Sequence, residues 1–312
     1  MQYGPFKLPL CAILRFVFFT TFLFSQVPQY QWSRVIEHAP FSGSYNFQMF
    51  SIRDTLRVIH SEGTWFSVDG KKWNHSPLSN IVTNQGFLDY VFFKGSLFGL
   101  GTFAGNIEHF TQTTAIHVTT DMKNWKLLAN ESSLPKRFFY HPFVFKDKIW
   151  IIGGSDGTQE FSDAWNSADG VHWKKIAESL PFGRRQNCQF VHFKGKLFML
   201  SNDVWSSTDG IRWTIECERL ANEEISGYTT VVYDDKIWLL GCSRNNVFKS
   251  EILVSADGKT WIPQRAPWSP RGGAAACVYN GKIFMTGGKY GGFNNGQTEF
   301  VYSNDVWMMG KK

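Results

Sequence analysis

Three arginines stand just before apolar segments of this chain, and together they could bind an acidic ligand. Arg137 follows the sequence LPK, Arg185 follows LPFGR and Arg271 follows SP. Guanidinium groups that converge on one point bind a carboxylate through paired hydrogen bonds. The alternative is structural, because an arginine that pairs with a nearby acid inside a fold mimics a functional site. In the first case, we expect all three side chains to open onto one mouth of a central channel.

A second group of candidates could recognise a sugar. The segment 289–299 (KYGGFNNGQTE) contains Tyr290, Asn294 and Glu299, which combine an aromatic ring, an amide and a carboxylate. Such side chains stack on sugar rings and bond to hydroxyl groups. His109 is a further candidate in another loop. The alternative for 289–299 is a flexible, glycine-rich loop without a ligand.

Motifs of common catalytic and cofactor sites are absent from the sequence. None of the eight histidines pairs at metal-ligand spacing with another histidine or a cysteine. The chain contains no Gly-x-Ser-x-Gly element, P-loop or dinucleotide fingerprint. We therefore expect no metal and no cofactor, and we assign no catalytic residue.

Repeated sequence patterns show which elements must position these residues. A small turn followed by an apolar run occurs six times, at intervals of 41, 52, 48, 40 and 46 residues. The copies begin at Asp54, Gly95, Asp147, Gly195, Asp235 and Gly281. A period of about 40–50 residues built from short strands is typical of β-propeller blades.

A second pattern recurs with a similar period and places Asp-Gly between two large apolar residues. Its copies are 65–73, 165–173, 205–213 and 253–261, and 117–125 is a weaker copy. Asp-Gly between alternating strands predicts a tight hairpin, because glycine adopts the positive φ that the turn needs. Met122 replaces this glycine in the weaker copy, so we expect another turn type there. His117 stands where most copies carry tryptophan, so we expect it to pack within its blade.

The tryptophans that close these copies are predicted to begin the fourth strand of each blade and to be buried between blades. They are Trp73, Trp173, Trp213 and Trp261.

The two ends of the chain predict how the ring closes. The sixth repeat stops after Asp305-Val306-Trp307, without its Asp-Gly turn and fourth strand. A matching strand, QWSRVIEHAP, occurs at 31–40. We therefore predict an all-β fold, a six-bladed β-propeller of four-stranded antiparallel blades, in which the N-terminal strand completes the C-terminal blade. Such closure removes open sheet edges.

The pattern resembles kelch-type repeats of the bacterial kelch-like family, which is related to the central domain of galactose oxidase. The resemblance rests on Gly153-Gly154 and Gly287-Gly288, on Asp-Val-Trp at Asp203 and Asp305, and on the spaced tryptophans. The Ser-x-Asp-Gly-x-x-Trp element also resembles the Asp-box turns of sialidases, although it is one residue shorter. Over 31–312, the resemblance implies the propeller fold.

The copper chemistry of galactose oxidase does not follow from this resemblance. Tyr140-His141 is similar to part of that copper site, but no second set of tyrosine, histidine and cysteine matches it. Some six-bladed kelch-type propellers are mutarotases of acidic sugars, which need an acid–base group and a carboxylate clamp but no cofactor. The arginines could supply the clamp. The acid–base group could be one of Glu62, Glu108, Glu160, Glu223, Glu224 and Glu299.

The first 26 residues differ in composition from the rest. They contain Lys7 and Arg15, no acidic residue, and a short apolar run at 16–24. This composition is typical of a secretory signal peptide, so we expect residues 1–26 to be a leader and 27–312 a single propeller domain. The alternative is an N-terminal membrane anchor at 8–24, against which Arg15 argues. We expect a secreted, periplasmic or cell-surface protein with no membrane span after cleavage.

Charge and cysteine content exclude some partners. The formal charge of +6 falls to +4 without Lys7 and Arg15, and no Lys/Arg cluster occurs, so we do not expect nucleic acid as a partner. The remaining cysteines match no zinc or redox motif, and we expect them mainly as small buried side chains, although export permits a disulfide. They are Cys188, Cys217, Cys242 and Cys277.

The face that carries the longer connections is the expected binding surface. With strands a to d counted outward in each blade, the b–c and d–a connections share one face, called here the variable face. Its long b–c segments are 101–113, 155–162, 243–249 and 289–299, whereas blade four has only Ser201-Asn202, which predicts a notch. Variable loops on a rigid repeat usually carry binding. We expect a monomeric glycan- or protein-binding module, with the mutarotase as the alternative.

Overall fold

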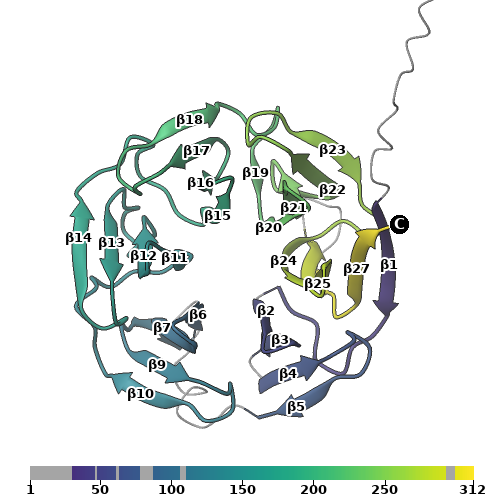
Figure 1. Cartoon of the computed structure of the whole chain (residues 1–312), viewed down its shortest axis with the longest axis horizontal. Coiled ribbons are helices and arrows are strands. Elements are labelled where there is room, and N and C mark those ends of the chain that lie inside the picture. Colours follow the sequence, from purple (N-terminus) through teal and green to yellow (C-terminus); the bar gives the residue numbers. More distant parts are fainter. Residues whose placement is uncertain (1–29, 46–47, 61–62, 78–86, 106–109, 293–298) are drawn as a thin grey trace, which may run out of the picture.

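The computed structural model describes residues 30–45, 48–60, 63–77, 87–105, 110–292 and 299–312. These residues form six antiparallel sheets around a central axis, as Figure 1 shows. The described part of the chain contains no helix, and therefore none that is long and apolar enough to cross a membrane. The predicted six-bladed propeller is confirmed.

Blades one to three follow each other along the chain, each with its first strand nearest the axis. Blade one consists of β2 (Gln48–Ile52), β3 (Thr55–His60), β4 (Gly63–Ser67) and β5 (Asn74–Ser76). Blade two consists of β6 (Phe87–Phe93), β7 (Ser96–Gly105), β9 (Ile116–Thr119) and β10 (Lys126–Ala129), with β8 (Phe110–Gln112) paired to β7. Blade three consists of β11 (Phe143–Phe145), β12 (Lys148–Ile152), β13 (Ala164–Ser167) and β14 (Trp173–Ala177).

Blades four to six complete the ring. Blade four consists of β15 (Gln189–Phe193), β16 (Lys196–Leu200), β17 (Val204–Ser207) and β18 (Thr214–Cys217). Blade five consists of β20 (Thr229–Tyr233), β21 (Lys236–Arg244), β22 (Val247–Ser255) and β23 (Ile262–Arg265), with β19 (Ile225–Ser226) paired to β21. Blade six consists of β24 (Gly272–Tyr279), β25 (Lys282–Gly291), β27 (Val306–Lys311) and β1 (Tyr30–Ile36), with β26 (Phe300–Tyr302) paired to β25.

The ring is closed by β1, as the sequence predicts. Its ladder with β27 is antiparallel and aligns Trp32 with Met309 and Arg34 with Trp307. The indole of Trp32 also packs edge-to-face on that of Trp268, with ring centroids 4.6 Å apart. The first described strand therefore joins the last strand to blade five.

The core lies between the blades rather than within any one sheet. One buried cluster, for example, joins Trp150 of blade three to Met199 of blade four. Trp173 and Trp213, at 7% and 8% exposure, are buried as predicted. Trp73 and Trp261 are only half-buried, so the prediction holds for two of the four. The fourth strand begins at the tryptophan only in β14, and elsewhere it begins one residue later.

The Asp-Gly turns are held by their own side chains. In blade one, the amide of Gly70 donates to Ser67 Oγ at 2.9 Å, and the amides of Lys71 and Lys72 donate to Asp69 Oδ1 at 2.8 and 2.9 Å. These bonds hold the pKa of Asp69 below its ordinary value. The serine and aspartate side chains therefore impose the turn on the residue that follows the aspartate.

Met122 corrects the expectation of a different turn in blade two. It adopts φ 63°, and its amide donates to Thr119 Oγ1 at 2.9 Å, as the glycine amide does elsewhere. Asp121 Oδ1 accepts the next two amides at 2.8 Å each. The cost of a non-glycine residue in this conformation, about 1–2 kcal/mol, is offset by burial of the Met122 side chain at 3% exposure.

His117 packs inside blade two, as predicted. Its side chain is completely buried, neither ring nitrogen has a hydrogen-bond partner, and burial lowers its pKa. The neutral imidazole therefore fills an apolar slot.

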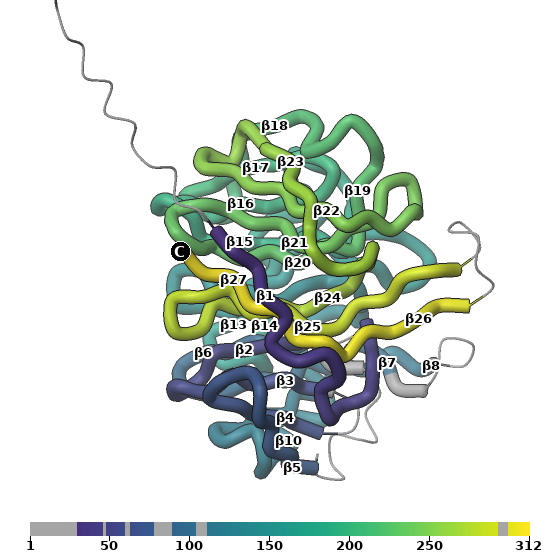
Figure 2. The backbone as a smooth tube through the Cα atoms, turned by 90° about the vertical axis from the view of Figure 1, so that its right-hand side faces the viewer, coloured from purple at the N-terminus to yellow at the C-terminus, as the bar shows by residue number. Residues whose placement is uncertain are grey.

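Some of the expected loops on the variable face are β-hairpin arms. β21 and β22 continue outward to a two-residue turn at Asn245-Asn246, where both residues have positive φ. β25 continues outward to pair with β26. In Figure 2, this arm and the β7–β8 arm project on the same side of the disc. The variable face therefore carries projecting β-hairpin arms, formed by β21–β22, β25–β26 and β7–β8.

Candidate functional site

The three arginines do not form the expected clamp. Arg137 is 2% exposed and binds Asp163 through two parallel bonds, Nη1 to Oδ1 at 2.8 Å and Nη2 to Oδ2 at 3.1 Å. Arg271 binds Asp305 in the same way, at 2.5 and 3.0 Å. Arg185 donates to Asp203 at 2.6 Å. Each guanidinium is therefore engaged by an aspartate of the blade whose first strand it precedes.

These ion pairs belong to a repeated structural triad. The indole Nε1 of the tryptophan two residues after each aspartate donates to the same carboxylate, at 2.6 Å for Trp165 and at 2.8 Å for Trp205 and Trp307. Arg137 also donates to the carbonyl of Gly153 at 3.0 Å. The reason for this correction is local. Each guanidinium reaches the aspartate at the start of strand c in its own blade, so it does not extend into a channel mouth shared with the other arginines. The mutarotase alternative thereby loses its carboxylate clamp.

The remaining candidates are not brought together. Tyr290 lies half-buried on β25 opposite Val301, and Glu299 is exposed at the outer end of the same arm, where its carbonyl accepts from the amide of Gly292. Glu160 and Glu224 lie on separate blades. His109, Asn294, Glu62 and Glu108 lie outside the described residues. Glu223 lines the cleft described next.

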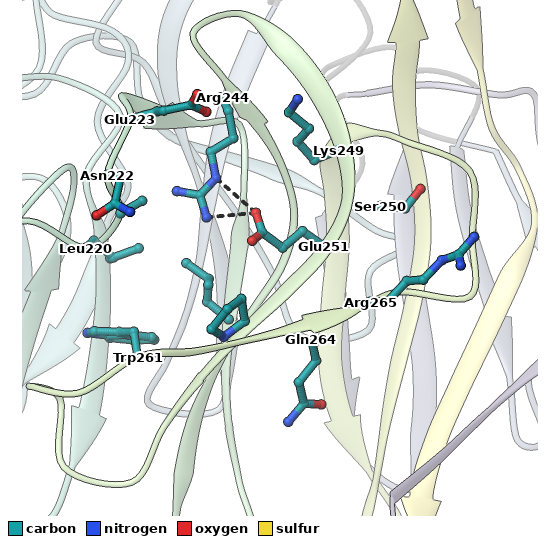
Figure 3. Close-up of a pocket in the computed structure, with 13 residues that line it drawn as sticks. Leu220, Asn222, Glu223, Arg244, Lys249, Ser250, Glu251, Trp261, Gln264 and Arg265 are labelled. Atoms are coloured by element: carbon teal, nitrogen blue, oxygen red, sulfur yellow. Dashed lines mark hydrogen bonds and ion pairs between the residues drawn. The ribbon is translucent and has the colours of Figure 1, made fainter.

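A cleft of about 720 Å³ opens on the side of blade five that faces blade four (Figure 3). One wall is the d–a segment 220–223, and the other is formed by β22, β23 and Trp261. Asn202 holds the first wall, because its carbonyl accepts from the amide of Leu220 and its side-chain oxygen accepts from the amide of Ile225, both at 2.8 Å. The cleft therefore lies beside the short b–c connection of blade four.

The cleft exists because a repeated aromatic pair is missing. In three other blades an aromatic residue of the d–a segment packs edge-to-face on the strand-c tryptophan, with centroids 5.8–5.9 Å apart. The pairs are Phe41–Trp65, Phe182–Trp205 and Trp268–Trp307. By sequence position, blade five carries Asn222 and Leu253 instead. Two large rings are replaced by an amide and an aliphatic side chain, which leaves an open volume.

Blade three tests this explanation within the same molecule. It keeps Trp165, but Lys136 stands where the other blades carry the d–a aromatic residue. A smaller cleft of about 330 Å³ lies there, lined by Trp165. One missing ring therefore accompanies a small cleft, and two missing rings accompany the larger one.

Arg244 and Glu251 give the larger cleft its chemistry. Glu251 occupies the triad's aspartate position, but its partner Arg244 comes from the end of β21. Nε and Nη2 of Arg244 both donate to Glu251 Oε2, at 2.9 and 2.7 Å. The side chain of Arg244 is only 9% exposed, and its Nη1 is buried without a hydrogen-bond partner. Figure 3 shows this nitrogen turned away from Glu251 toward Asn222.

A residue that lines the cleft therefore holds an unused donor in a partly apolar setting. Leu253 and the half-buried Trp261 supply apolar surface, and the indole Nε1 of Trp261 is a second buried donor without a partner. A buried donor without a partner costs about 1–3 kcal/mol, and a ligand oxygen would recover that cost. The remaining polar and charged lining residues are Asn222, Glu223, Lys249, Ser250, Gln264 and Arg265.

The described cysteines are all free thiols. Cys242 lies beside the cleft, with Sγ 3.6 Å from Glu251 Oε2, and burial raises its pKa to about 12. Such a thiol stays protonated at neutral pH and is a poor nucleophile.

A second cluster of titratable groups lies where blades two and three meet near the axis. Burial raises the pKa of Asp89 to about 7 and lowers that of His141 to about 4. Tyr140 is buried, and burial together with the charge of Asp89 raises its pKa well above the ordinary value. Within the described residues, no three His, Cys, Asp or Glu side chains are grouped to hold a metal ion.

Asp89→Asn should stabilise the protein increasingly as the pH rises from 4 to 7. The Asp89 carboxyl titrates near 4 when unfolded and at about 7 when folded, so the stability it contributes is present below pH 4 and is lost as the pH rises through 7. Urea unfolding at pH 4 and pH 8 should show a gain on the order of 2 kcal/mol at the higher pH only. The exposed variant Asp54→Asn is the control, and an equal gain at both pH values would contradict the desolvation of the Asp89 carboxyl.

Comparison with known proteins places the chain among β-propellers. Residues 119–220 match the DUF6242 beta propeller domain. The chain is 25% identical over 211 residues to the Leucine-zipper-like transcriptional regulator 1 of Pongo abelii, over 58% of this chain and 25% of that protein. The match thus spans about a quarter of that relative's length. The solved structure of YjhT covers 87% of this chain and 95% of its own, with a TM-score of 0.67 and 14% identity. The chain is a β-propeller protein, and this architecture suggests a binding or interaction module.

Proposed function

We propose that this propeller is a secreted glycan-binding module whose ligand occupies the cleft beside Arg244. One observation carries the proposal: the buried guanidinium of Arg244 keeps an Nη1 without a partner beside a cleft whose counterpart in three other blades is filled by an aromatic pair. A structural ion pair would use its donors, as Arg137 and Arg271 do.

The cleft suits a sugar better than an apolar ligand. Its volume of about 720 Å³ falls within the range of about 300–1,000 Å³ that is usual for ligand pockets. Amide, carboxylate, guanidinium and hydroxyl groups alternate with Leu253 and Trp261 along its walls. A pyranose offers the complementary mixture, with hydroxyl groups around its edge and C–H groups on its faces.

Two further parts of the proposal rest on sequence. Export depends on residues 1–26, which lie outside the described residues. The kelch-type relationship is supported by the di-glycines at Gly153-Gly154 and Gly287-Gly288, all four of which have positive φ where strand b ends or continues outward.

Filling the cleft with the repeat's own aromatic pair should abolish glycan binding. In Asn222→Phe/Leu253→Trp, the two rings would occupy the ligand volume as Phe182 and Trp205 do in blade four. An immobilised panel of neutral, amino and uronic-acid oligosaccharides, followed by calorimetry on those retained, should show binding by the wild type. We expect the filled variant to lose at least about 10-fold in affinity and to keep its thermal transition.

The matched control is Ile262→Trp, which adds an indole to an exposed position of blade five outside the cleft. It should bind as the wild type does. Retention of binding by the filled variant would exclude the cleft as the site. Absence of binding to the whole panel by the wild type would remove the glycan proposal.

A further inference from the structure

The arm of blade six carries an exposed aromatic surface that is separate from the cleft. We call it the arm patch and define it by Tyr45, Lys289, Phe300, Val301 and Tyr302. Its four apolar side chains are 43–45% exposed. Tyr45 stacks on Tyr302 with centroids 5.9 Å apart. Clustered exposed apolar side chains usually mark an interaction site, whereas isolated ones do not.

Lys289 gives this surface a defined charge. Its Nζ lies 4.2 Å from the ring centroid of Tyr45 and 4.5 Å from that of Phe300. No carboxylate of the described residues pairs with it, and burial lowers its pKa. The two ring faces attract the ammonium but do not neutralise it. The patch is therefore complementary to a carboxylate set among apolar groups.

Backbone hydrogen bonds and a ring contact fix the position of the arm patch within the propeller itself. Tyr302 and Phe300 lie opposite Lys289 and Gly291 in the β25–β26 ladder. Backbone bonds flank the short strand on both sides, from Ser303 N to Gly288 O at 2.9 Å and from Gly292 N to Glu299 O at 3.0 Å. Phe248 of the blade-five arm packs edge-to-face on Phe300 at 6.4 Å. An ordered surface loses little conformational entropy when it binds.

The distribution of side chains favours a protein segment over a sugar. Successive residues of a strand point to opposite faces, so Phe300 and Tyr302 lie on one face of β26 and Val301 on the other. A sugar ring would cover one face, whereas a polypeptide can contact both. Aromatic side chains such as Tyr45, Phe300 and Tyr302 are also enriched at protein interfaces.

We propose that the arm patch docks an acidic, apolar segment of a partner protein, with a carboxylate of that segment placed against Lys289. This interaction is independent of the cleft, and the two could operate at the same time. It assigns the variable face a protein-binding role beyond the proposed glycan site.

Two synthetic peptides test the proposal. One is an acetylated eight-residue peptide in which glutamate alternates with leucine, and its twin has glutamine for every glutamate. In an NMR titration of the labelled protein, the acidic peptide should shift the signals of Lys289, Phe300 and Tyr302. Its affinity should fall at least about 5-fold for the twin and for Lys289→Gln, and more for Phe300→Ser/Tyr302→Ser.

The controls are Lys126→Gln, an exposed cation of blade two, and Ile262→Ser, an exposed apolar residue of blade five; both should bind the peptide as the wild type does. Equal binding of both peptides, unchanged binding by Lys289→Gln, or no binding would overturn the proposal. So would a wild-type dimer that Phe300→Ser/Tyr302→Ser converts to a monomer, because the occupant would then be a second copy of the chain.

Discussion

Deleting residues 27–40 is expected to abolish cooperative thermal unfolding. The deletion removes β1, whose ladder with β27 closes the ring, and it leaves the edge of β27 unpaired. It also removes the edge-to-face contacts of Tyr30 with Trp238 at 4.8 Å and of Trp32 with Trp268 at 4.6 Å. An open propeller exposes a sheet edge that promotes aggregation. Calorimetry should show a broad, low-enthalpy transition in place of a single sharp one.

A synthetic peptide of residues 27–40 provides the control for this deletion. Added in excess, it should pair with β27 and restore a sharp transition, whereas a scrambled peptide should not. If the truncated protein unfolded as sharply as the full chain and at the same temperature, β1 would not be needed to close the ring.

Arg137→Ala is expected to destabilise the protein by about 3–5 kcal/mol, because it leaves the carboxylate of Asp163 buried without its cation. Chemical unfolding monitored by tryptophan fluorescence measures the loss. The double variant Arg137→Met/Asp163→Leu should recover much of it, because no uncompensated charge remains.

An exposed ion pair is the matched control for this substitution. Arg212 pairs with Asp209 at 2.8 Å, but its side chain is 90% exposed, so Arg212→Ala should cost less than about 1 kcal/mol. If Arg137→Ala were as mild as this control, the guanidinium would be free for a ligand, and the clamp interpretation would return.

Repeat spacing was sufficient to predict the ring, because period and strand length are properties of the sequence itself. The strand that closes the ring could also be predicted, since QWSRVIEHAP supplies the strand that the sixth repeat lacks. The turn at Met122 could not be predicted from that residue alone. Its conformation is set by Thr119 and Asp121, whose side chains accept the turn amides.

The arginines show where sequence patterns are ambiguous. A clamp of converging arginines and three separate structural triads both require an arginine just before the first strand of a blade, so the sequence position alone does not distinguish them. The distinguishing signal is the aspartate two residues before each strand-c tryptophan, which occurs in the blades that carry these arginines: Asp163, Asp203 and Asp305.

The cleft was harder to foresee because it results from two absences. Neither Asn222 nor Leu253 is unusual by itself, and they lie 31 positions apart in the chain. Only the pairing of d–a aromatic residues with strand-c tryptophans, visible in the folded blades, shows that blade five lacks both partners. Arg244 was likewise missed, because its partner Glu251 becomes its neighbour through the β21–β22 hairpin.

The most direct test of the glycan site observes the two donors beside the cleft that have no hydrogen-bond partner, Arg244 Nη1 and Trp261 Nε1. The measurement is a ¹H–¹⁵N NMR titration of the side-chain signals of Arg244 and Trp261 with an oligosaccharide retained by the panel. A ligand in the cleft should shift the guanidinium signals of Arg244 and the indole Nε1 signal of Trp261, while the indole signals of Trp165 and Trp307, whose Nε1 atoms are already bonded to aspartates, stay in place. Saturable binding that leaves Arg244 and Trp261 unchanged would show that the ligand binds elsewhere on the propeller.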